Sequence, residues 1–309
     1  MSWWKEAVFY QIYPRSFNDS DGDGVGDIPG IVEKIEYIDE LGVDAVWLNP
    51  VYESPQVDYG YDVSDYRSVH DEYGTMDDLE ELLEELHGRE IRLVMDLVVN
   101  HTSDEHDWFA KSRERDKKYS DYYVWREGKD GGPPNNWESA FGGSAWTYDE
   151  EREEYYLRLF HESQPDLNWR NPDVRDDVVE MVEWWLEKGV DGFRMDVINL
   201  LSKPEGLPDG DPERDWVGSE HFANGPMIHE YLTELCERAS EPHDTFTVGE
   251  TPEITPEGAE EYSQDGLDMV IPFEHMELDH GDDVDWFVTD VDLLELKDVF
   301  SRWQEADCW

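Results

Sequence analysis

The chain has 309 residues, of which 78 are acidic and 24 are basic, so its formal net charge is −54. This charge argues against nucleic acid or an anionic membrane as a partner, because both are negatively charged themselves. The 14 Trp, 16 Tyr and 11 Phe residues exclude a disordered chain, since disordered chains contain few aromatic residues. Because the acidic residues are spread over helix faces, as in 77–85, we predict a folded protein with a hydrated, halophilic surface adapted to molar salt.

Cysteine usage and hydropathy bear on where the protein is found. Cys236 and Cys308 are too few for a disulfide framework or a zinc site. The N-terminal residues lack the apolar stretch of a secretion signal, and no apolar run approaches the length of a membrane span, about 18 residues. We therefore expect a soluble, cytoplasmic protein.

Short apolar segments alternate with segments of helical spacing along most of the chain. One helix is predicted from Ile31, Ile35, Ile38 and Leu41, which Gly42 ends. Further helices are predicted at 75–88, 171–189, 226–239 and 291–306. The predicted strands are 8–13, 43–50, 91–99, 190–198, 245–250 and 269–274. Strands that alternate with helices indicate an α/β fold with a parallel sheet.

The alternation predicts part of a TIM barrel, the (β/α)8 fold. About six of its eight strand–helix units are found here. The first three strands occupy 1–101 and the last three, with their helices, occupy 171–309. Between them, 102–170 is rich in aromatic residues and has no helical period, so we predict a small domain inserted after the third strand.

Charged and polar side chains gather where the predicted strands end. Arg194 and Asp196 are two positions apart, so on a strand they share a face. A buried ion pair that fixes the register of the sheet is one interpretation. However, His101 and Glu250 also end strands, and catalytic groups of TIM barrels lie at the C-terminal ends of the strands. This coincidence favours a catalytic site. Glu274, at the end of the sixth strand, is left open between facing that site and supporting the sheet.

A loop after the first strand has the composition of a cation site. Carboxylates alternate with glycines in Asp19-Ser-Asp21-Gly-Asp23-Gly-Val25-Gly-Asp27. Such a loop can surround a hard cation with oxygen atoms. The twelfth position is glycine rather than glutamate and a strand precedes the loop, so it is not an EF-hand. We predict a structural calcium site, with magnesium and a metal-free acidic turn as the alternatives.

Four segments resemble glycoside hydrolase family 13, the α-amylase family. They are Asp96-Leu-Val-Val-Asn-His101, Gln164-Pro-Asp-Leu-Asn168, Gly192-Phe-Arg-Met-Asp196 and Val248-Gly-Glu250-Thr. The resemblance extends from Trp3 through nearly the whole chain and is strongest to the oligo-1,6-glucosidase and α-glucosidase branch.

The resemblance implies a role for each residue of the site. Asp196 would be the nucleophile and Glu250 the general acid/base. Asp96 stands earlier in its strand, and from that position we predict a structural role, as a partner of Arg194. The terminal glucose would be surrounded by Asp58, Tyr61, His101, Arg194, Phe141, Phe160 and Gln164. Val197 is similar to the residue found in members that prefer α-1,6 linkages. The calcium ligands would be Asp19, Asp21, Asp23, Asp27 and the Val25 carbonyl.

The resemblance thus implies a retaining α-glucosidase that acts on isomalto- and malto-oligosaccharides without an organic cofactor. Transglucosylation and sucrose isomerisation are nearby variants of the same chemistry. Relative to the family pattern, strands seven and eight, a histidine and carboxylate at the end of strand seven, and a C-terminal β-domain are not found within 1–309. A second interpretation is therefore an impaired fragment, or a non-catalytic member that binds sugar or a partner protein. Open barrel edges would favour self-association or a second chain that completes the barrel.

The acidic surface yields a prediction about salt. Because salt screens repulsion between the surface carboxylates, lowering KCl from about 3 M to about 0.1 M should unfold the protein or lower its melting temperature markedly. Circular dichroism at both concentrations measures this. Equal spectra and melting temperatures would show that the surface does not require salt.

Overall fold

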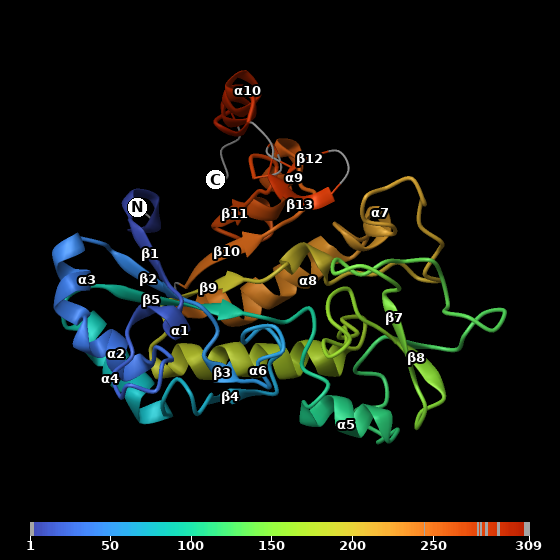
Figure 1. The fold of residues 1–309 in the computed structure, drawn as a ribbon, viewed down its shortest axis with the longest axis horizontal. Coiled ribbons are helices and arrows are strands. Elements are labelled where there is room, and N and C mark those ends of the chain that lie inside the picture. The colour runs from blue at the N-terminus through green and yellow to red at the C-terminus, as the bar shows by residue number, and fades with distance from the viewer. Residues whose placement is uncertain are drawn as a thin grey trace.

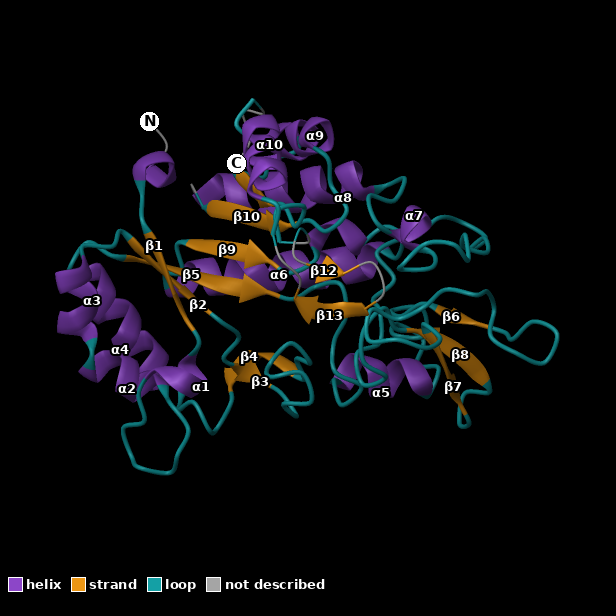
Figure 2. Cartoon of the chain, turned by 45° about the horizontal axis from the view of Figure 1, so that its top comes forward, coloured by secondary structure: helices purple, strands orange, loops and turns teal. Residues whose placement is uncertain are grey.

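Six parallel strands form the central sheet of the protein, and they are neighbours in the order in which the chain makes them (Figures 1 and 2). The computed structural model describes residues 3–243, 245–276, 278, 280–281, 284–288 and 291–305. The strands are β1 (Phe9–Ile12), β2 (Ala45–Leu48), β5 (Arg92–Leu97), β9 (Gly192–Met195), β10 (Phe246–Glu250) and β11 (Met269–Ile271). This sequential, all-parallel order is the one that successive strand–helix units of a barrel generate.

Helices follow each of these strands. The principal ones are α3 (Ile35–Leu41), α4 (Met76–His87), α6 (Pro172–Lys188), α8 (Ile228–Leu235), α9 (Pro256–Gln264) and α10 (Leu293–Trp303). Thr75 begins α4 with a capping box that includes Asp78. Asn171 caps α6, which ends at Gly189 in the left-handed conformation, with φ of 107°.

The helix predicted as one segment from Ile31 to Leu41 is in fact two. Lys34 separates α2 (Ile28–Glu33) from α3, and Leu41 is 44% exposed rather than part of the core. A non-helical residue between two helices shifts the angular phase of the second. Within α3, Ile35 and Ile38 are buried, whereas Leu41, the last residue of the helix, is about 120° around the axis from Ile35 and lies outside the apolar stripe.

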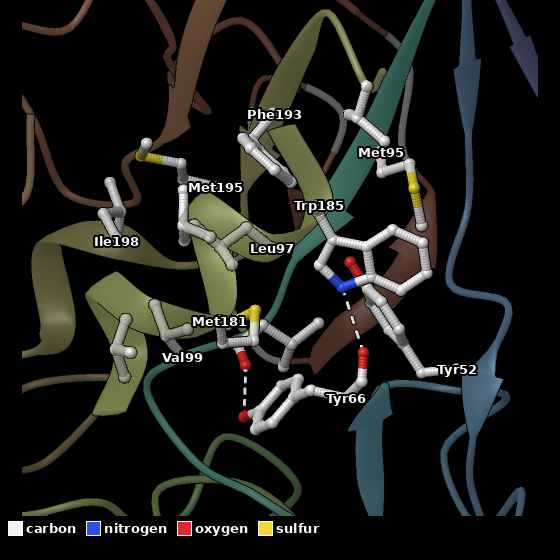
Figure 3. Close-up of a cluster of buried hydrophobic side chains, with 14 of the residues drawn as sticks. Tyr52, Tyr66, Met95, Leu97, Val99, Met181, Trp185, Phe193, Met195 and Ile198 are labelled. Carbon is white, nitrogen blue, oxygen red and sulfur yellow. Dashed lines mark hydrogen bonds between the residues drawn. The ribbon is translucent and has the colours of Figure 1, made fainter. Parts of the chain in front are cut away.

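Helix α6 packs against the sheet through a cluster of aromatic and sulfur-containing side chains (Figure 3). Trp185 of α6 donates its indole N–H to the carbonyl oxygen of Tyr66 over 3.0 Å. The Tyr66 hydroxyl in turn donates to the carbonyl oxygen of Val98, just after β5, over 2.7 Å. Large side chains can be buried here because their polar atoms find partners.

The segment 102–170 contributes no strand to the central sheet. It forms α5 (Asp107–Arg113) and a three-stranded antiparallel sheet of β6 (Trp125–Arg126), β8 (Glu154–Leu157) and β7 (Trp146–Asp149). Its apolar residues share a core with the loop that follows β9. For example, Trp137 donates its indole N–H to the Pro208 carbonyl oxygen. The inserted segment is thus packed onto the barrel.

The remaining elements are short. They are η1 (Trp3–Glu6), α1 (Pro14–Phe17), β3 (Tyr52–Glu53), β4 (Asp65–Val69), η2 (Ile198–Leu200), α7 (Ser219–Phe222), η3 (Cys236–Ser240), η4 (Glu241–His243), β12 (His280–Gly281) and β13 (Val284–Val288). Cys236 is buried, whereas Cys308 lies outside the described residues. Among the described helices, none has the length and apolar character that crossing a membrane requires.

The sheet and the inserted segment together determine where a site can form. In Figure 2 the arrowheads of β5, β9 and β10 point toward the inserted segment. Since parallel strands end at the same edge, residues at their C-termini are brought together there.

Candidate active site

A single buried guanidinium binds three carboxylates at this edge of the sheet. Arg194 on β9 donates from Nη1 to Asp96 Oδ1 over 2.6 Å and to Asp196 Oδ1 over 2.7 Å. Its Nη2 lies 2.6 Å from Glu250 Oε2. Asp96 lies on β5 and Glu250 on β10, while Asp196 directly follows β9. These three strands are neighbours in the sheet. The predicted pair of Arg194 and Asp196 is therefore part of a four-residue cluster, and Asp96 is the partner of Arg194 that the sequence suggested.

The backbone turns sharply directly after Asp196. The strand predicted to reach Ile198 ends at Met195, because Val197 adopts the left-handed conformation with φ of 37°. This conformation is strained for a β-branched residue. It directs the Val197 N–H toward Glu250, whose Oε2 accepts that hydrogen bond over 3.1 Å. The turn thus links the backbone beside Asp196 to the carboxyl of the neighbouring strand.

Burial gives Glu250 an unusual affinity for a proton. Loss of hydration raises its pKa to about 7, and the charge of Asp196 acts in the same direction. Arg194 and the Val197 N–H oppose this shift. A carboxyl that is partly protonated near neutral pH can both donate and accept a proton during a reaction.

Asp96 is held deeper than the other two carboxylates. It is fully buried, and burial raises its pKa to about 6 although Arg194 opposes the shift. The indole N–H of Trp47 donates to its Oδ2 over 2.9 Å. Arg194 and Trp47 between them occupy both oxygens of Asp96, which is the arrangement of a structural carboxylate.

Four polar residues from three segments of the chain lie beside this cluster, and two of them, Asp58 and Tyr61, belong to the same turn. Gln164 donates from Nε2 to Asp58 Oδ2 over 2.9 Å, and His101 Nε2 is 3.2 Å from the same amide nitrogen. His101 Nε2 also lies 3.1 Å from the Tyr61 carbonyl oxygen. The Tyr61 ring is 5.8 Å from the Arg194 guanidinium, so the two groups of polar residues adjoin. Burial raises the pKa of Asp58 as well.

Aromatic rings extend the same region toward the surface. The ring of Phe160 is 5.2 Å from that of His101 and 5.9 Å from that of Phe141. Phe141 is 53% exposed, so the row leads from buried polar groups to solvent. The structure therefore brings together all the residues that the sequence placed around a terminal sugar.

Two residues near the cluster, Trp47 and Lys203, were not predicted to take part in the site, and the role of Glu274 was left open. Trp47 was not among the predicted site residues, although its position on β2 two residues before Asn49 could have shown that it faces the barrel interior. Lys203, which binds Asp166 and Asn100 in the interior, gave no signal in its loop. Glu274 contacts Arg302 and Trp303 of α10, so it anchors a helix and is not part of the cluster.

The loop at 19–27 gathers three of its four predicted carboxylates. Oxygen atoms of Asp19, Asp21 and Asp27 lie within 4.8 Å of one another. Asp23 is outside this group, and its Oδ1 accepts a hydrogen bond from the Val25 N–H. Carboxylate oxygens at this spacing fit a hard divalent cation.

Comparison with known proteins shows which family has this architecture. The family profile described as "Alpha amylase, catalytic domain" matches residues 11–308. The chain belongs to the α-amylase family. Its fold is the TIM barrel of that family, as the resemblance predicted.

Relatives within the α-amylase family are close in sequence and structure. The chain is 57% identical to an oligo-1,6-glucosidase of Bacillus cereus, over 98% of this chain and 56% of that protein. It is 48% identical to a trehalose-6-phosphate hydrolase of Bacillus subtilis, over 98% of this chain and 54% of that protein. The chain thus spans little more than half the length of these relatives.

Solved structures of the family superpose closely on the chain. The trehalose-6-phosphate hydrolase of Bacillus licheniformis superposes with a TM-score of 0.95 at 49% identity, covering 100% of this chain and 57% of that one. An isomaltulose synthase from Klebsiella superposes with a TM-score of 0.96 at 44% identity, covering 99% and 56%.

The proton affinity of Glu250 yields a prediction about stability. Because its pKa in the folded protein, about 7, is above the ordinary value of 4.5, protonation favours the folded state. This contribution is complete below the ordinary pKa and is lost as pH rises through about 7. The melting temperature of Glu250→Gln, compared with that of the parent, should therefore be higher at about pH 8 than at about pH 5.

Thermal melts of the parent and variant in the same salt at both pH values measure this gain. Glu81→Gln, on the exposed side of α4, is the matched control and should show no such difference. An equal effect of Glu250→Gln at both pH values would contradict the raised pKa.

Proposed function

We propose that the protein is a retaining α-glucosidase that removes terminal glucose from isomalto- and malto-oligosaccharides, with a preference for α-1,6 linkages. The observation that carries this proposal is the shared binding of Asp196 and Glu250 to Arg194. Retaining glycosidases need two carboxyls about 5–5.5 Å apart, one of which attacks while the other is protonated. One guanidinium that binds both carboxyls keeps them close, and only Glu250 is bound to the Val197 N–H.

The chemistry follows from the different surroundings of the two carboxyls. Asp196, whose negative charge Arg194 stabilises, attacks the anomeric carbon and forms a glucosyl ester. Glu250 donates its proton to the departing glycosidic oxygen. In the second step Glu250, now ionised, takes a proton from a water molecule that attacks the anomeric carbon and releases glucose. A pKa near 7 suits a group that must act as both acid and base.

The neighbouring polar groups would hold the terminal glucose. Asp58 offers carboxylate oxygens, and a sugar hydroxyl at this point would accept from the N–H groups of His101 and Gln164 in exchange for their present acceptors, Asp58 and the Tyr61 carbonyl oxygen. Phe160 and Phe141 offer apolar faces on which sugar rings can pack. These groups come from separate loops that meet beside the carboxylates, so they can contact one sugar ring from several sides.

The preference for α-1,6 linkages is supported by relatives and by one residue. Three of the relatives at 55% identity or more are named oligo-1,6-glucosidases. Val197 borders the two catalytic carboxyls, where it can limit the approach of the second sugar. Sucrose isomerisation is the second candidate, supported by the superposition on isomaltulose synthase. It would use the same glucosyl ester, with fructose rather than water as the acceptor.

The assignment of Asp196 as the nucleophile can be tested directly in the full-length protein. Asp196→Asn should abolish release of glucose from isomaltose, because the amide cannot form the glucosyl ester. Glucose release and product analysis from isomaltose, maltose and sucrose in high salt measure the activity of each protein. Asp77→Asn, on the exposed first turn of α4, is the control and should retain the parent rate.

Three outcomes distinguish the candidates. Parent-like turnover by Asp196→Asn would overturn the assignment of the nucleophile. Formation of isomaltulose from sucrose without hydrolysis would favour the isomerase. Absence of turnover in the folded parent would favour the non-catalytic alternative.

We also propose that the loop at 19–27 binds calcium through Asp19, Asp21 and Asp27, and that calcium stabilises the start of α2. Asp27 supports this role because it caps α2 by accepting a hydrogen bond from the Gly30 N–H over 2.6 Å. A bound ion would oppose repulsion between the clustered carboxylates. EDTA should therefore lower the melting temperature, and calcium should restore it better than magnesium.

The variant Asp21→Ala provides the control for calcium binding. Its melting temperature should be lower than that of the parent and should not respond to EDTA. An equal response of parent and variant to EDTA would contradict a site at this loop.

A further inference from the structure

A chain of buried polar side chains connects the loop after β9 to His101. Lys203 Nζ lies 2.6 Å from Asp166 Oδ2 and donates to Asn100 Oδ1 over 2.8 Å. Asn100 Nδ2 donates to Asp166 Oδ2 over 3.1 Å and is 3.3 Å from His101 Nδ1. All four residues are at least nine-tenths buried. The hydrogens of these groups therefore have few alternative partners.

Lys203 determines which way the Asn100 amide faces. An ammonium group can only donate, so the atom that it contacts in Asn100 must be the oxygen. The amide nitrogen is then on the other side, where one hydrogen is used by Asp166. Its second hydrogen points to His101 Nδ1, which must accept it and cannot carry a hydrogen itself.

The opposite edge of the imidazole agrees with this assignment. His101 Nε2 is 3.1 Å from the Tyr61 carbonyl oxygen, which can only accept, so Nε2 carries the hydrogen. Gln164 is oriented independently, because its Oε1 accepts from the His161 N–H over 2.9 Å. Its Nε2 hydrogens reach Asp58 and the Tyr61 carbonyl oxygen. The 3.2 Å contact from Gln164 Nε2 to His101 Nε2 is then a contact of two donors.

We propose that Lys203 is a positioning residue that, through Asn100, holds His101 in the tautomer with its hydrogen on Nε2. This tautomer keeps an N–H donor beside Asp58, where the proposed function places a terminal glucose, so that a sugar hydroxyl there would share this hydrogen with the Tyr61 carbonyl oxygen or replace it as the acceptor. The opposite tautomer would present a lone pair there and lose a hydrogen bond to a sugar hydroxyl. The catalytic consequence rests on the proposed function, whereas the tautomer itself does not.

Cross-linking of the inserted segment is the competing role for Lys203. Asp166 belongs to that segment and its Oδ1 accepts from the Leu159 N–H, so the ion pair also ties the segment to the barrel. A purely structural role would alter stability without changing the hydrogen on His101. The two roles are therefore distinguished by observing the imidazole directly.

Nitrogen NMR of protein labelled with ¹⁵N-histidine measures the tautomer, and His101→Gln assigns the signals by their loss. In the parent protein, Nδ1 of His101 should appear as an unprotonated nitrogen and Nε2 as a protonated one. A protonated Nδ1 with an unprotonated Nε2 would overturn the proposal. This measurement needs neither substrate nor turnover.

An exchange of two side chains tests the coupling. In Asn100→Asp/Asp166→Asn the buried cluster keeps one carboxylate, one amide and one ammonium group, so its charge is conserved. In this variant the side chain at position 100 has only acceptor oxygens, and one of them lies next to Nδ1 of His101. The imidazole should therefore carry its hydrogen on Nδ1, where this oxygen can accept it. If so, kcat/KM for glucosides should fall about tenfold, which corresponds to one lost hydrogen bond.

Lys188→Met, which breaks an exposed lysine–carboxylate pair with Glu80, is the control and should change neither the tautomer nor kcat/KM. An exchange variant that is folded and keeps both the parent tautomer and the parent kcat/KM would overturn the coupling. If the exchange prevents folding, the parent spectrum still decides the tautomer. If the parent turns over no glucoside, the proposed function fails while the spectrum remains decisive for His101.

Discussion

The site depends on the neutralisation of buried negative charge by one guanidinium. Asp96, Asp196 and Glu250 come from three adjacent strands and all contact Arg194. Buried carboxylates at such close range would repel one another strongly, and each has also lost hydration. A planar cation with several donors can satisfy three of them at once, which a lysine could not do with the same geometry. Without Arg194 the strands could not end in carboxylates at a single point.

Differences in environment then separate the roles of these carboxyls. Asp96 is fully buried and bound on both oxygens, so it supports Arg194 from below. Glu250 has a pKa near 7 because burial and Asp196 outweigh Arg194. The strained turn at Val197 connects the two halves of the proposed reaction, since it places a backbone N–H on Glu250 next to Asp196. Backbone strain of this kind is maintained only where surrounding contacts hold it.

The inserted segment completes the site from outside the sheet. It supplies Gln164, Phe160 and Phe141, and it is fastened to the barrel by the buried contacts of Asp166 and Trp137. The same buried contacts orient Asn100 beside His101. Attachment of the segment and orientation of a sugar-binding group are thus physically one network, in which a change at Lys203 would be felt at both places.

Much of the fold and of the site could be predicted from the sequence because the relevant patterns are local. Alternation of strands and helices determined the parallel sheet, and the positions of Arg194, Asp196 and Glu250 at strand ends determined that they would meet. Elsewhere local patterns were insufficient. The break at Lys34 and the early end of β9 depend on how the following residues pack, and helical spacing or apolar character alone does not contain that information.

Only the tertiary structure shows which side chains that are distant in the sequence contact one another. The sequence by itself determined the family, the barrel and the identity of the carboxyls at the strand ends. The contact of Glu250 with Arg194, the role of Trp47 and the link from Lys203 to His101 required the folded protein, whereas partial burial of Glu250 and its retained proton could be expected from the apolar residues before it. The physical reason is that desolvation and hydrogen-bond direction arise from atoms that come together only when residues up to about a hundred positions apart are packed side by side.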